Sequence, residues 1–409
     1  MDQRGPLLRN MFAAAIAAAD PALCVPKHLP APPKGRTIVL GAGKAAASMA
    51  KAVEDHWNGP LEGLVVTRYG HSVPCQQIEV VEAAHPVPDQ AGRDAAQRML
   101  HLAQSASADD LVLCLISGGG SALLTLPADG VSFEDKQEIN RALLASGAGI
   151  SEMNCVRRHL SRIKGGQLAA ACYPARVVSL IISDVPGDDL GAIASGPTVP
   201  DASTREEAQA ICARLGIQAP TCVETPKPGD PVFARVENHL ISSGLASLNA
   251  AADVARQAGY EPLVLGDFIE GEAREIGLVM AGIARHMARQ LAREGKRCAI
   301  ISGGEARVTG AKSGRGGRNS EFLLSLALAL EGADICALAG DTDGIDGSEN
   351  NAGALLLPQT LSHLRAKGHD PRALLDSHRS YDAFDATGGL IVTGPTLTNV
   401  NDVRIVLVG

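Results

Sequence analysis

Short apolar runs alternate with segments of helical spacing through the first 200 residues of the chain. The runs are the expected strands, 37–40, 63–67, 78–83, 111–116 and 177–183. Between them, 44–56, 89–104 and 133–146 repeat apolar residues at intervals of three and four, which predicts amphipathic helices. Such an alternation predicts a parallel sheet with helices on both faces. We therefore expect a Rossmann-like α/β domain here.

The pattern is interrupted at 222–231, where three prolines and a glycine fall within ten residues (CVETPKPGDP). Beyond this linker we expect strands at 240–242, 262–266, 297–301, 335–339, 389–392 and 403–408, and helices at 245–258, 272–294 and 320–330. We place a domain boundary at the linker. The prediction is an N-terminal Rossmann-like domain over 1–230 and a smaller mixed α/β domain over 231–409, with the last strand able to return to the first domain.

An apolar stretch near the N-terminus follows two arginines and loosely resembles a signal peptide. Its side chains Leu8, Met11, Phe12, Ile16 and Ala19 share one helical face, which predicts an amphipathic helix that docks on the protein. No stretch of the sequence reaches the roughly 20 apolar residues of a membrane-spanning helix. We therefore expect no membrane partner.

Charge and cysteine content narrow the functional classes. A net charge of −8 argues against a nucleic-acid partner, because phosphate backbones are bound by clustered positive surfaces. The nine cysteines are odd in number and none is spaced C-x-x-C, which indicates reduced thiols in the cytoplasm rather than disulfides or a zinc site.

The first candidate site follows the first strand, at Gly41-Ala42-Gly43-Lys44. Glycines allow close backbone approach, a helix N-terminus offers N–H groups to an anion, and Lys44 adds a positive charge, so phosphate binding is favoured. The same residues fit a loose dinucleotide fingerprint, although the second strand ends Val66-Thr67-Arg68 without the expected ribose-binding acid. A purely structural strand–helix turn is the third interpretation.

Two further strands are expected to end in Ser/Gly turns. Ser117-Gly118-Gly119-Gly120-Ser121 follows the run LVLCLI and predicts a backbone nest for an anion, with a flexible hairpin turn as the alternative. Ser302-Gly303-Gly304 repeats the pattern. Because ligands of open α/β sheets bind at the carboxyl ends of strands, we expect both turns to contact a ligand.

Carboxylates also follow expected strands, at Asp184, Asp341 and Asp343. Mg²⁺ is held in proteins by one or two carboxylates together with substrate phosphates, so these residues are the candidate metal ligands. The segment 341–347 superficially resembles a Ca²⁺ loop, but the glutamate expected at its twelfth position is Ala352.

Two segments concentrate positive charge. Residues 154–167 contain Arg157, Arg158, Arg162 and Lys164, of which we expect at least two to lie on a solvated helix face, while the cluster also suits a carboxylate or phosphate. Residues 301–321 combine paired glycines with Glu305, Arg307, Lys312, Arg315 and Arg318, a composition that suits a lid over phosphates.

Eight segments together resemble the glycerate 2-kinase family, also called class II glycerate kinases, with its MOFRL-type C-terminal domain. They are LRNMFAAAIAAADP, GAGKAAASMA, HPVPDQAG, LISGGGSALL, RRHLSRIKGGQLA, ISDVPGDDLGAIASGPTVPD, ISGGEARVTGAKSGRGGRNSE and GDTDGIDG, in this order along nearly the whole chain.

The resemblance implies two α/β domains with an active site in the cleft between them. It implies ATP and a divalent cation such as Mg²⁺ as cofactors, and phosphorylation of D-glycerate at the 2-hydroxyl. The family's lysine and arginine correspond to Lys44 and Arg318, and Asn319 beside the arginine joins the expected cofactor-binding residues. Members are often labelled hydroxypyruvate reductases.

Our mechanistic hypothesis is that Lys44 and Arg318 approach the transferring phosphoryl group from opposite domains. The turns at 117–121 and 302–304 would hold phosphates or the substrate carboxylate, Asp184 would hold Mg²⁺ or accept the hydroxyl proton, and Glu305 is a second candidate base. The rivals are an NAD(P)H-dependent hydroxypyruvate reductase and a non-catalytic sugar-acid binding protein. A monomer or a homodimer is expected.

Overall fold

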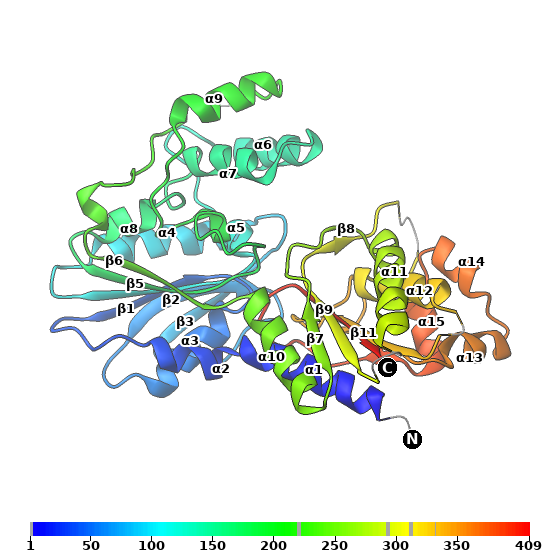
Figure 1. Cartoon of the computed structure of the whole chain (residues 1–409). Coiled ribbons are helices and arrows are strands. Elements are labelled where there is room, and N and C mark those ends of the chain that lie inside the picture. The colour runs from blue at the N-terminus through cyan, green and yellow to red at the C-terminus, as the bar shows by residue number, and fades with distance from the viewer. Residues whose placement is uncertain (1–2, 219–221, 292–294, 311–313, 332) are drawn as a thin grey trace. The chain divides into compact units, whose positions relative to one another are not determined.

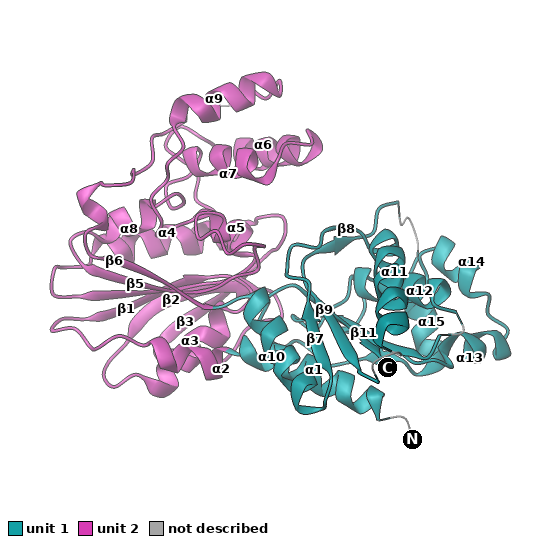
Figure 2. Ribbon diagram, in the orientation of Figure 1, with its two compact units in different colours: residues 1–20, 242–409 teal, residues 21–241 magenta. Residues whose placement is uncertain are grey.

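The computed structural model describes residues 3–218, 222–291, 295–310, 314–331 and 333–409. The chain forms two compact units, unit 1 from residues 1–20 and 242–409 and unit 2 from residues 21–241 (Figure 2). Lys312 and the last residues of the helix expected at 272–294 lie outside the described ranges.

Unit 2 is built on a six-stranded sheet of Rossmann-like order. Its strands are β1 (Thr37–Ala42), β2 (Glu62–Arg68), β3 (Ile78–Ala83), β4 (Leu111–Ile116), β5 (Arg176–Ile182) and β6 (Val236–Ser242), in the spatial order β3-β2-β1-β4-β5-β6. Strands β1 to β5 run parallel. The strand order reverses between β1 and β4, and such a switch point is where doubly wound sheets bind ligands. The predicted fold class is confirmed for this unit.

Helices cover both faces of this sheet. In Figure 1, α3 (Ala46–His56) and α4 (Gln90–Gln104) lie on opposite sides of it. Strands β1 and β4 are buried along their whole length, as expected of strands covered on both faces. The remaining helices are α2 (Pro21–Cys24), α5 (Gly120–Leu123), α6 (Phe133–Ala145), α7 (Ile150–His159), α8 (Gln167–Cys172) and α9 (Arg205–Arg214).

Helices α6, α7 and α9 form a small subdomain with a core of its own, which includes Leu143, Val156 and Cys212 (Figure 1). The sequence pattern does not predict α9, and it indicates α7 only as the solvated helix face expected within 154–167. Both are ten residues long and polar on average, so their apolar periodicity is weak.

Unit 1 contains a mixed sheet, as predicted. It comprises β7 (Glu261–Val264), β9 (Cys298–Ser302), β11 (Ile335–Asp341), β12 (Gly353–Leu356), β13 (Leu390–Ile391) and β14 (Asp402–Val408), in the order β13-β12-β11-β14-β9-β7. Only the β7–β9 pair is parallel among these described strands. A two-stranded ribbon pairs β8 (Gly271–Glu272) with β10 (Ala306–Arg307).

One face of the mixed sheet packs on α11 (Ala273–Leu291), α12 (Arg318–Ala329), α13 (Thr360–Ala366), α14 (Pro371–Asp376) and α15 (Ser380–Thr387). The other face packs on α1 (Arg4–Ala18) and α10 (Gly244–Gln257). Unit 1 therefore has two hydrophobic layers, one on each side of its sheet.

The compact units divide the chain differently from the predicted boundary at 230. The linker candidate 222–231 belongs to unit 2, which continues to residue 241, and the first 20 residues belong to unit 1. Helix α1 buries Leu8, Met11 and Phe12 in the layer that contains α10, so its apolar face finds its partner in the C-terminal part of the chain. Strand β14 pairs with β11 and β9 and does not return to unit 2.

None of the nine cysteines, all of which lie in the described part of the chain, forms a disulfide, and every one except Cys75 is buried. Within the described ranges, no single helix is long and apolar enough to cross a membrane. Helix α1 and the following segment Pro21–His28 meet that test only as a pair bent by 59°.

Candidate functional site

Three backbone N–H groups of the turn after β1 donate hydrogen bonds to acceptors within unit 2. The N–H of Gly43 donates to the carbonyl of Val66 (3.1 Å), that of Lys44 to the carbonyl of Gly118 (2.8 Å), and that of Ala45 to the Ser117 hydroxyl (3.0 Å). These amides are therefore not available to a phosphate or a pyrophosphate, contrary to the expectation from the glycine pattern. Lys44 therefore brings the charge of its side chain to this turn, and its backbone N–H is bound by Gly118.

Gly41 and Gly43 are needed for close packing of this turn. A Cβ on Gly43 would lie 2.1 Å from the Ser117 hydroxyl, and the backbone there has a φ of +141°. A Cβ on Gly41 would lie 2.6 Å from the carbonyl oxygen of Leu115. The two glycines thus allow the ends of β1 and β4 to approach each other, rather than offering amides to a ligand.

The neighbouring turn after β4 keeps donors available. In the described part of the chain, the N–H groups of Gly118 and Gly119 meet no hydrogen-bond acceptor, and Gly119 adopts the left-handed conformation (φ +79°). Successive amides in such a turn make a concave anion-binding nest. A Cβ on Gly119 would meet Lys44 Cγ at 3.3 Å and the ring of His85 at 3.2 Å. Lys44 and His85 therefore flank this turn.

The other residues of the turn are fixed by the segment after β5. The hydroxyls of Ser121 and Ser195 are 2.6 Å apart, and a Cβ on Gly120 would lie 2.8 Å from the Cβ of Ala194. Ala194 and Ser195 have φ values of +52° and +60°, which is strained for residues with a side chain. Asp184 follows β5 directly, so it lies at the same edge of the sheet as the turn after β4.

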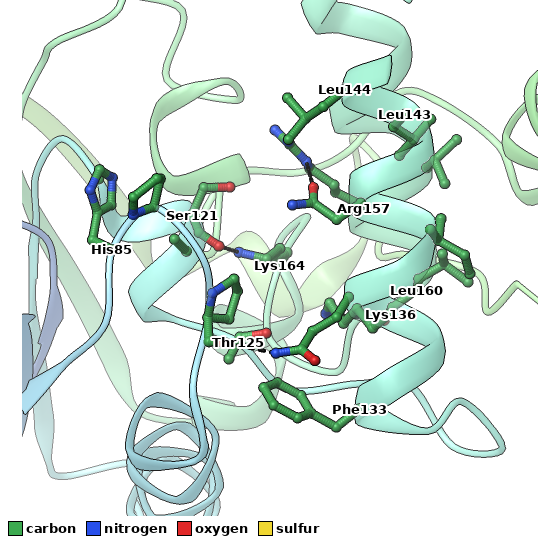
Figure 3. A pocket seen from close by; sticks show the side chains of 18 residues that line it. His85, Ser121, Thr125, Phe133, Lys136, Leu143, Leu144, Arg157, Leu160 and Lys164 are labelled. Atoms are coloured by element: carbon green, nitrogen blue, oxygen red, sulfur yellow. Dashed lines mark hydrogen bonds between the residues drawn. The ribbon is translucent and has the colours of Figure 1, made fainter. Parts of the chain in front are cut away.

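A cavity of about 230 Å³ opens beside this turn (Figure 3). Gly119, Ser121 and His85 line it on one side, and residues of α6 and α7 line it on the other. Three of the lining side chains, Lys136, Arg157 and Lys164, are basic. Arg157 and Lys164 belong to the cationic stretch 154–167 of the sequence, whereas Lys136 lies outside it.

In unit 1, Arg318 is bound by three carboxylates. It donates from Nε to Asp402 (2.7 Å), from one terminal nitrogen to Asp341 (2.7 Å) and from the other to Glu305 (3.2 Å). Burial opposes the charge of Arg318, but Asp402, Asp341 and Glu305 outweigh it, so the pKa of Arg318 is raised above its ordinary value. All its nitrogens are thus engaged within the unit.

Asp402 is the centre of this network, and the sequence analysis missed it. Its carboxylate accepts from Arg318, from the side-chain amide of Asn319 (2.8 Å) and from Arg404 (2.6 Å). Burial acts to raise the pKa of Asp402, but Arg318 and Arg404 overcome this effect and hold it below its ordinary value. Asp402 and Arg404 alternate along the otherwise apolar strand β14, and that spacing was the signal available in the sequence.

Asn319 and the turn after β9 are buried inside unit 1. Asn319 is fully buried and supports Asp402. Ser302 is also fully buried, and the N–H of Gly303 donates to the carbonyl of Gly266 (2.9 Å). The carbonyl of Gly303 accepts from Arg404 (2.9 Å). The turn at 302–304 therefore presents acceptors to an arginine and does not form an anion nest.

The carboxylates proposed as metal ligands are distributed over both units. Asp341 and Asp343 are buried in unit 1, where Asp341 binds Arg318 and accepts from the N–H of Asp343 (3.0 Å). Asp184 belongs to unit 2. Among the described residues, no group of three or more histidine, cysteine or acidic side chains is arranged to hold a metal ion.

Asp346, in the same acidic segment, has a structural role at the start of α12. Its carboxylate accepts from the N–H groups of Asn319 (2.8 Å) and Ser320 (2.9 Å), so it occupies the N-terminus of α12. Complete burial nevertheless raises the pKa of Asp346 above its ordinary value.

The fold and these turns define a two-unit α/β protein whose candidate ligand-binding residues lie at the carboxyl ends of strands. Residues 7–225 match the family model of a domain of unknown function, DUF4147, and residues 298–402 match the MOFRL family. The chain belongs to this family, the glycerate 2-kinase family, as its motifs predicted.

Relatives and a solved structure extend over nearly the whole chain. A D-glycerate 2-kinase of Thermotoga maritima is 41% identical over 96% of this chain and 95% of its own length. The crystal structure of a glycerate kinase from the same organism covers 100% of both chains with a TM-score of 0.91 and 40% identity. A protein of Agrobacterium vitis, provisionally named hydroxypyruvate reductase, is 54% identical over 98% of this chain and 94% of its own.

Proposed function

We propose that the protein is a glycerate 2-kinase, which transfers the γ-phosphate of ATP to the 2-hydroxyl of D-glycerate and releases ADP and 2-phosphoglycerate. The observation that carries the proposal is the 41% identity to a D-glycerate 2-kinase over almost the full length of both chains. The matched length extends over both units.

Phosphoryl transfer depends mainly on positioning and on neutralising charge on the phosphoryl oxygens. In the proposed mechanism the ammonium group of Lys44 and the amides of Gly118 and Gly119 bind phosphate oxygens in unit 2. Arg318 stabilises the transferring group from unit 1, and it must exchange one of its carboxylate partners for the phosphate. Because Lys44 and Arg318 belong to different units, the proposal requires both units to meet at one substrate.

Mg²⁺ is the proposed partner of the acidic cluster in unit 1. Glu305, Asp341 and Asp402 bind Arg318, and Asp402 also binds Arg404, so three carboxylates face two guanidinium groups. Asp343 lies two residues beyond Asp341 and donates its N–H to that carboxylate. Mg²⁺ prefers carboxylate oxygens and completes its shell with phosphates and water. Asp341 and Asp343 would hold the ion, with Asp184 as the candidate ligand or base from unit 2. When bound, the ion would neutralise charge on the nucleotide phosphates.

A hydroxypyruvate reductase is the rival, since a close relative carries that name. Its pyrophosphate site would need the amides of the turn after β1. Those amides are consumed by Val66, Gly118 and Ser117, and β2 ends at Arg68 without a ribose-binding acid. These observations favour the kinase.

Purified protein, D-glycerate, MgCl₂ and ATP should produce ADP in a coupled assay, and ³¹P NMR of the product should identify 2-phosphoglycerate. A parallel reaction with hydroxypyruvate and NADH or NADPH should show no oxidation of the cofactor. Reductase turnover without ADP formation would overturn the proposal, and 3-phosphoglycerate as the product would correct its regiochemistry.

A further inference from the structure

The cavity beside the turn after β4 concentrates positive charge without a counter-charge. Lys136 comes from α6, Arg157 from α7 and Lys164 from the segment that follows α7, and their side chains point into the same space (Figure 3). Among the described residues, no aspartate or glutamate lines the cavity.

In the described part of the chain, these three side chains donate their hydrogen bonds to neutral acceptors. Lys164 is 1% exposed and donates to the carbonyl of Ser121 (2.7 Å). Lys136 donates to the carbonyls of Leu126 and Leu160, each at 3.2 Å. Arg157 donates from Nε to the side-chain oxygen of Asn140 (2.9 Å), and a second, longer contact of 3.5 Å reaches Asn154.

Two neighbouring arginines of the same stretch, unlike these three side chains, are paired with carboxylates. Arg158 forms an ion pair with Asp201 (3.0 Å), and Arg162 forms one with Asp129 (3.4 Å). Over the described ranges, no such carboxylate pairs with Lys136, Arg157 or Lys164. The chain thus neutralises two of the cations around 157–164 and leaves the cavity-lining group without neutralisation.

This arrangement costs stability. Burial lowers the pKa of Lys136 to about 7, and the charge of Arg157 adds to that effect. Burial lowers the pKa of Lys164 well below its ordinary value, and Lys136 and Arg157 act in the same direction. An uncompensated buried cation is unfavourable, and asparagine or glutamine could donate to the same carbonyls without charge. A purely structural role, as hydrogen-bond donors to carbonyls, therefore does not explain why three basic side chains share one cavity.

We propose that Lys136, Arg157 and Lys164 form an oxyanion subsite that binds the carboxylate or phosphate group of a reactant beside Gly119 and Ser121. The subsite itself follows from the charges of unit 2, whereas its assignment to a kinase reactant rests on the proposed function. The two sources of the oxyanion are the carboxylate of glycerate and a phosphate of the nucleotide. Phe133, Leu143, Leu144 and Val156 form an apolar part of the wall, so the charged end of the ligand is directed to the three basic side chains.

The pH dependence of binding follows from Lys136. A bound oxyanion favours the ammonium form, so the pKa of Lys136 rises from about 7 when the ligand binds. Affinity should then be constant below pH 7 and fall as the pH rises above 7, until the pKa of the complex is reached. The Lys136 Cε resonance can be assigned in the NMR spectrum, because it is absent from Lys136→Gln. It should titrate at a higher pH in the complex than in the free protein.

Binding without turnover tests the subsite. D-glycerate, ADP and inorganic phosphate are each titrated into the wild-type protein and into Lys136→Gln and Lys164→Gln, which retain a donor for the carbonyls. Arg141→Gln is the matched control, because Arg141 is exposed on the same helix and does not line the cavity. Circular dichroism and Tm confirm that each variant is folded.

We expect each cavity variant to lose at least tenfold in affinity for one reactant and Arg141→Gln to stay within twofold of the wild type. A selective loss for glycerate assigns the oxyanion to its carboxylate, and a selective loss for ADP assigns it to a phosphate. If folded Lys136→Gln and Lys164→Gln bind both reactants within twofold of the wild type, or the control loses as much, the proposal is wrong. The kinase proposal has a separate test, because it fails only if the wild type forms no ADP.

Discussion

Replacing Arg318 by methionine should destabilise unit 1. This loss of stability has to be measured before a change in kcat can be assigned to catalysis. The substitution removes the guanidinium group from two carboxylates whose side chains are 0% (Asp402) and 5% (Asp341) exposed. Breaking a buried ion pair from one side costs about 3–5 kcal/mol, because a charge is left without compensation. Glu305 is 57% exposed and adds little, and Asp402 keeps Arg404 at 2.6 Å. We therefore expect a loss of about 3 kcal/mol in the free energy of unfolding.

Urea titration followed by far-UV circular dichroism measures this loss. The single tryptophan, Trp57, lies in unit 2, so its fluorescence reports separately on that unit. Arg315→Met is the matched control, since Arg315 binds Glu349 at the surface and should contribute less than about 1 kcal/mol.

The double variant Arg318→Met/Asp341→Asn should recover part of the stability, because it removes one of the uncompensated charges, but should recover no kinase activity. If Arg318→Met loses no more stability than Arg315→Met, then the carboxylates do not depend on Arg318 and the electrostatic reasoning is refuted. If the loss is found, a decrease in kcat must be measured at a known folded fraction before Arg318 is given a role in phosphoryl transfer.

Three other perturbations test the remaining features. Lys44→Met should lower kcat by about 10²–10³-fold in the ADP-coupled assay, as expected when a group that stabilises transition-state charge is removed, whereas the exposed Lys51→Met should stay within twofold of the wild type. Gly43→Ala should cost about 2–5 kcal/mol in urea titration, because its Cβ would clash with Ser117 in a strained conformation, whereas Gly282→Ala on α11 has open space and should gain about 0.5–1 kcal/mol. For Asp110, the effect of burial is outweighed by hydrogen bonds from Ser107 and Arg36, which hold the pKa of its carboxyl at about 2. The ionised carboxylate should therefore contribute roughly 2 kcal/mol to the free energy of unfolding. This contribution should be complete above pH 4 and lost as the pH falls toward 2. Asp110→Asn should flatten that pH dependence, and an unchanged profile would contradict the assignment.

The fold was predictable where one periodicity dominates. Strands β3 and β4 begin and end at the predicted residues, because their apolar runs are flanked by polar residues. The boundary of the units was not predictable from the prolines at 222–231, because proline stops helices and strands without deciding which core a segment joins. The partner of α1 was hidden for a related reason, since an apolar face does not indicate which distant surface covers it.

The candidate site was predictable as a set of turns but not as a set of contacts. Glycines after β1 and β4 look alike in the sequence, and only the structure shows that Ser117 and Gly118 consume the amides of one turn and leave those of the other. Asp402 and Lys136 were missed because each stands alone in its segment, without the glycines that marked the other candidates. Their importance comes from residues distant in the sequence, Arg318 for the first and Lys164 for the second.

The position of α1 has a consequence for how the chain is made. Unit 1 is formed by residues 1–20 together with residues 242–409. During synthesis, α1 therefore leaves the ribosome long before the strands of the sheet on which it packs. Unit 2 can complete its sheet in that interval, while the apolar face of α1 stays exposed to aggregation or to chaperones. A fragment that starts at residue 231 would lack this cover over Leu338 and Leu355, and attaching residues 4–20 through a linker should restore its solubility.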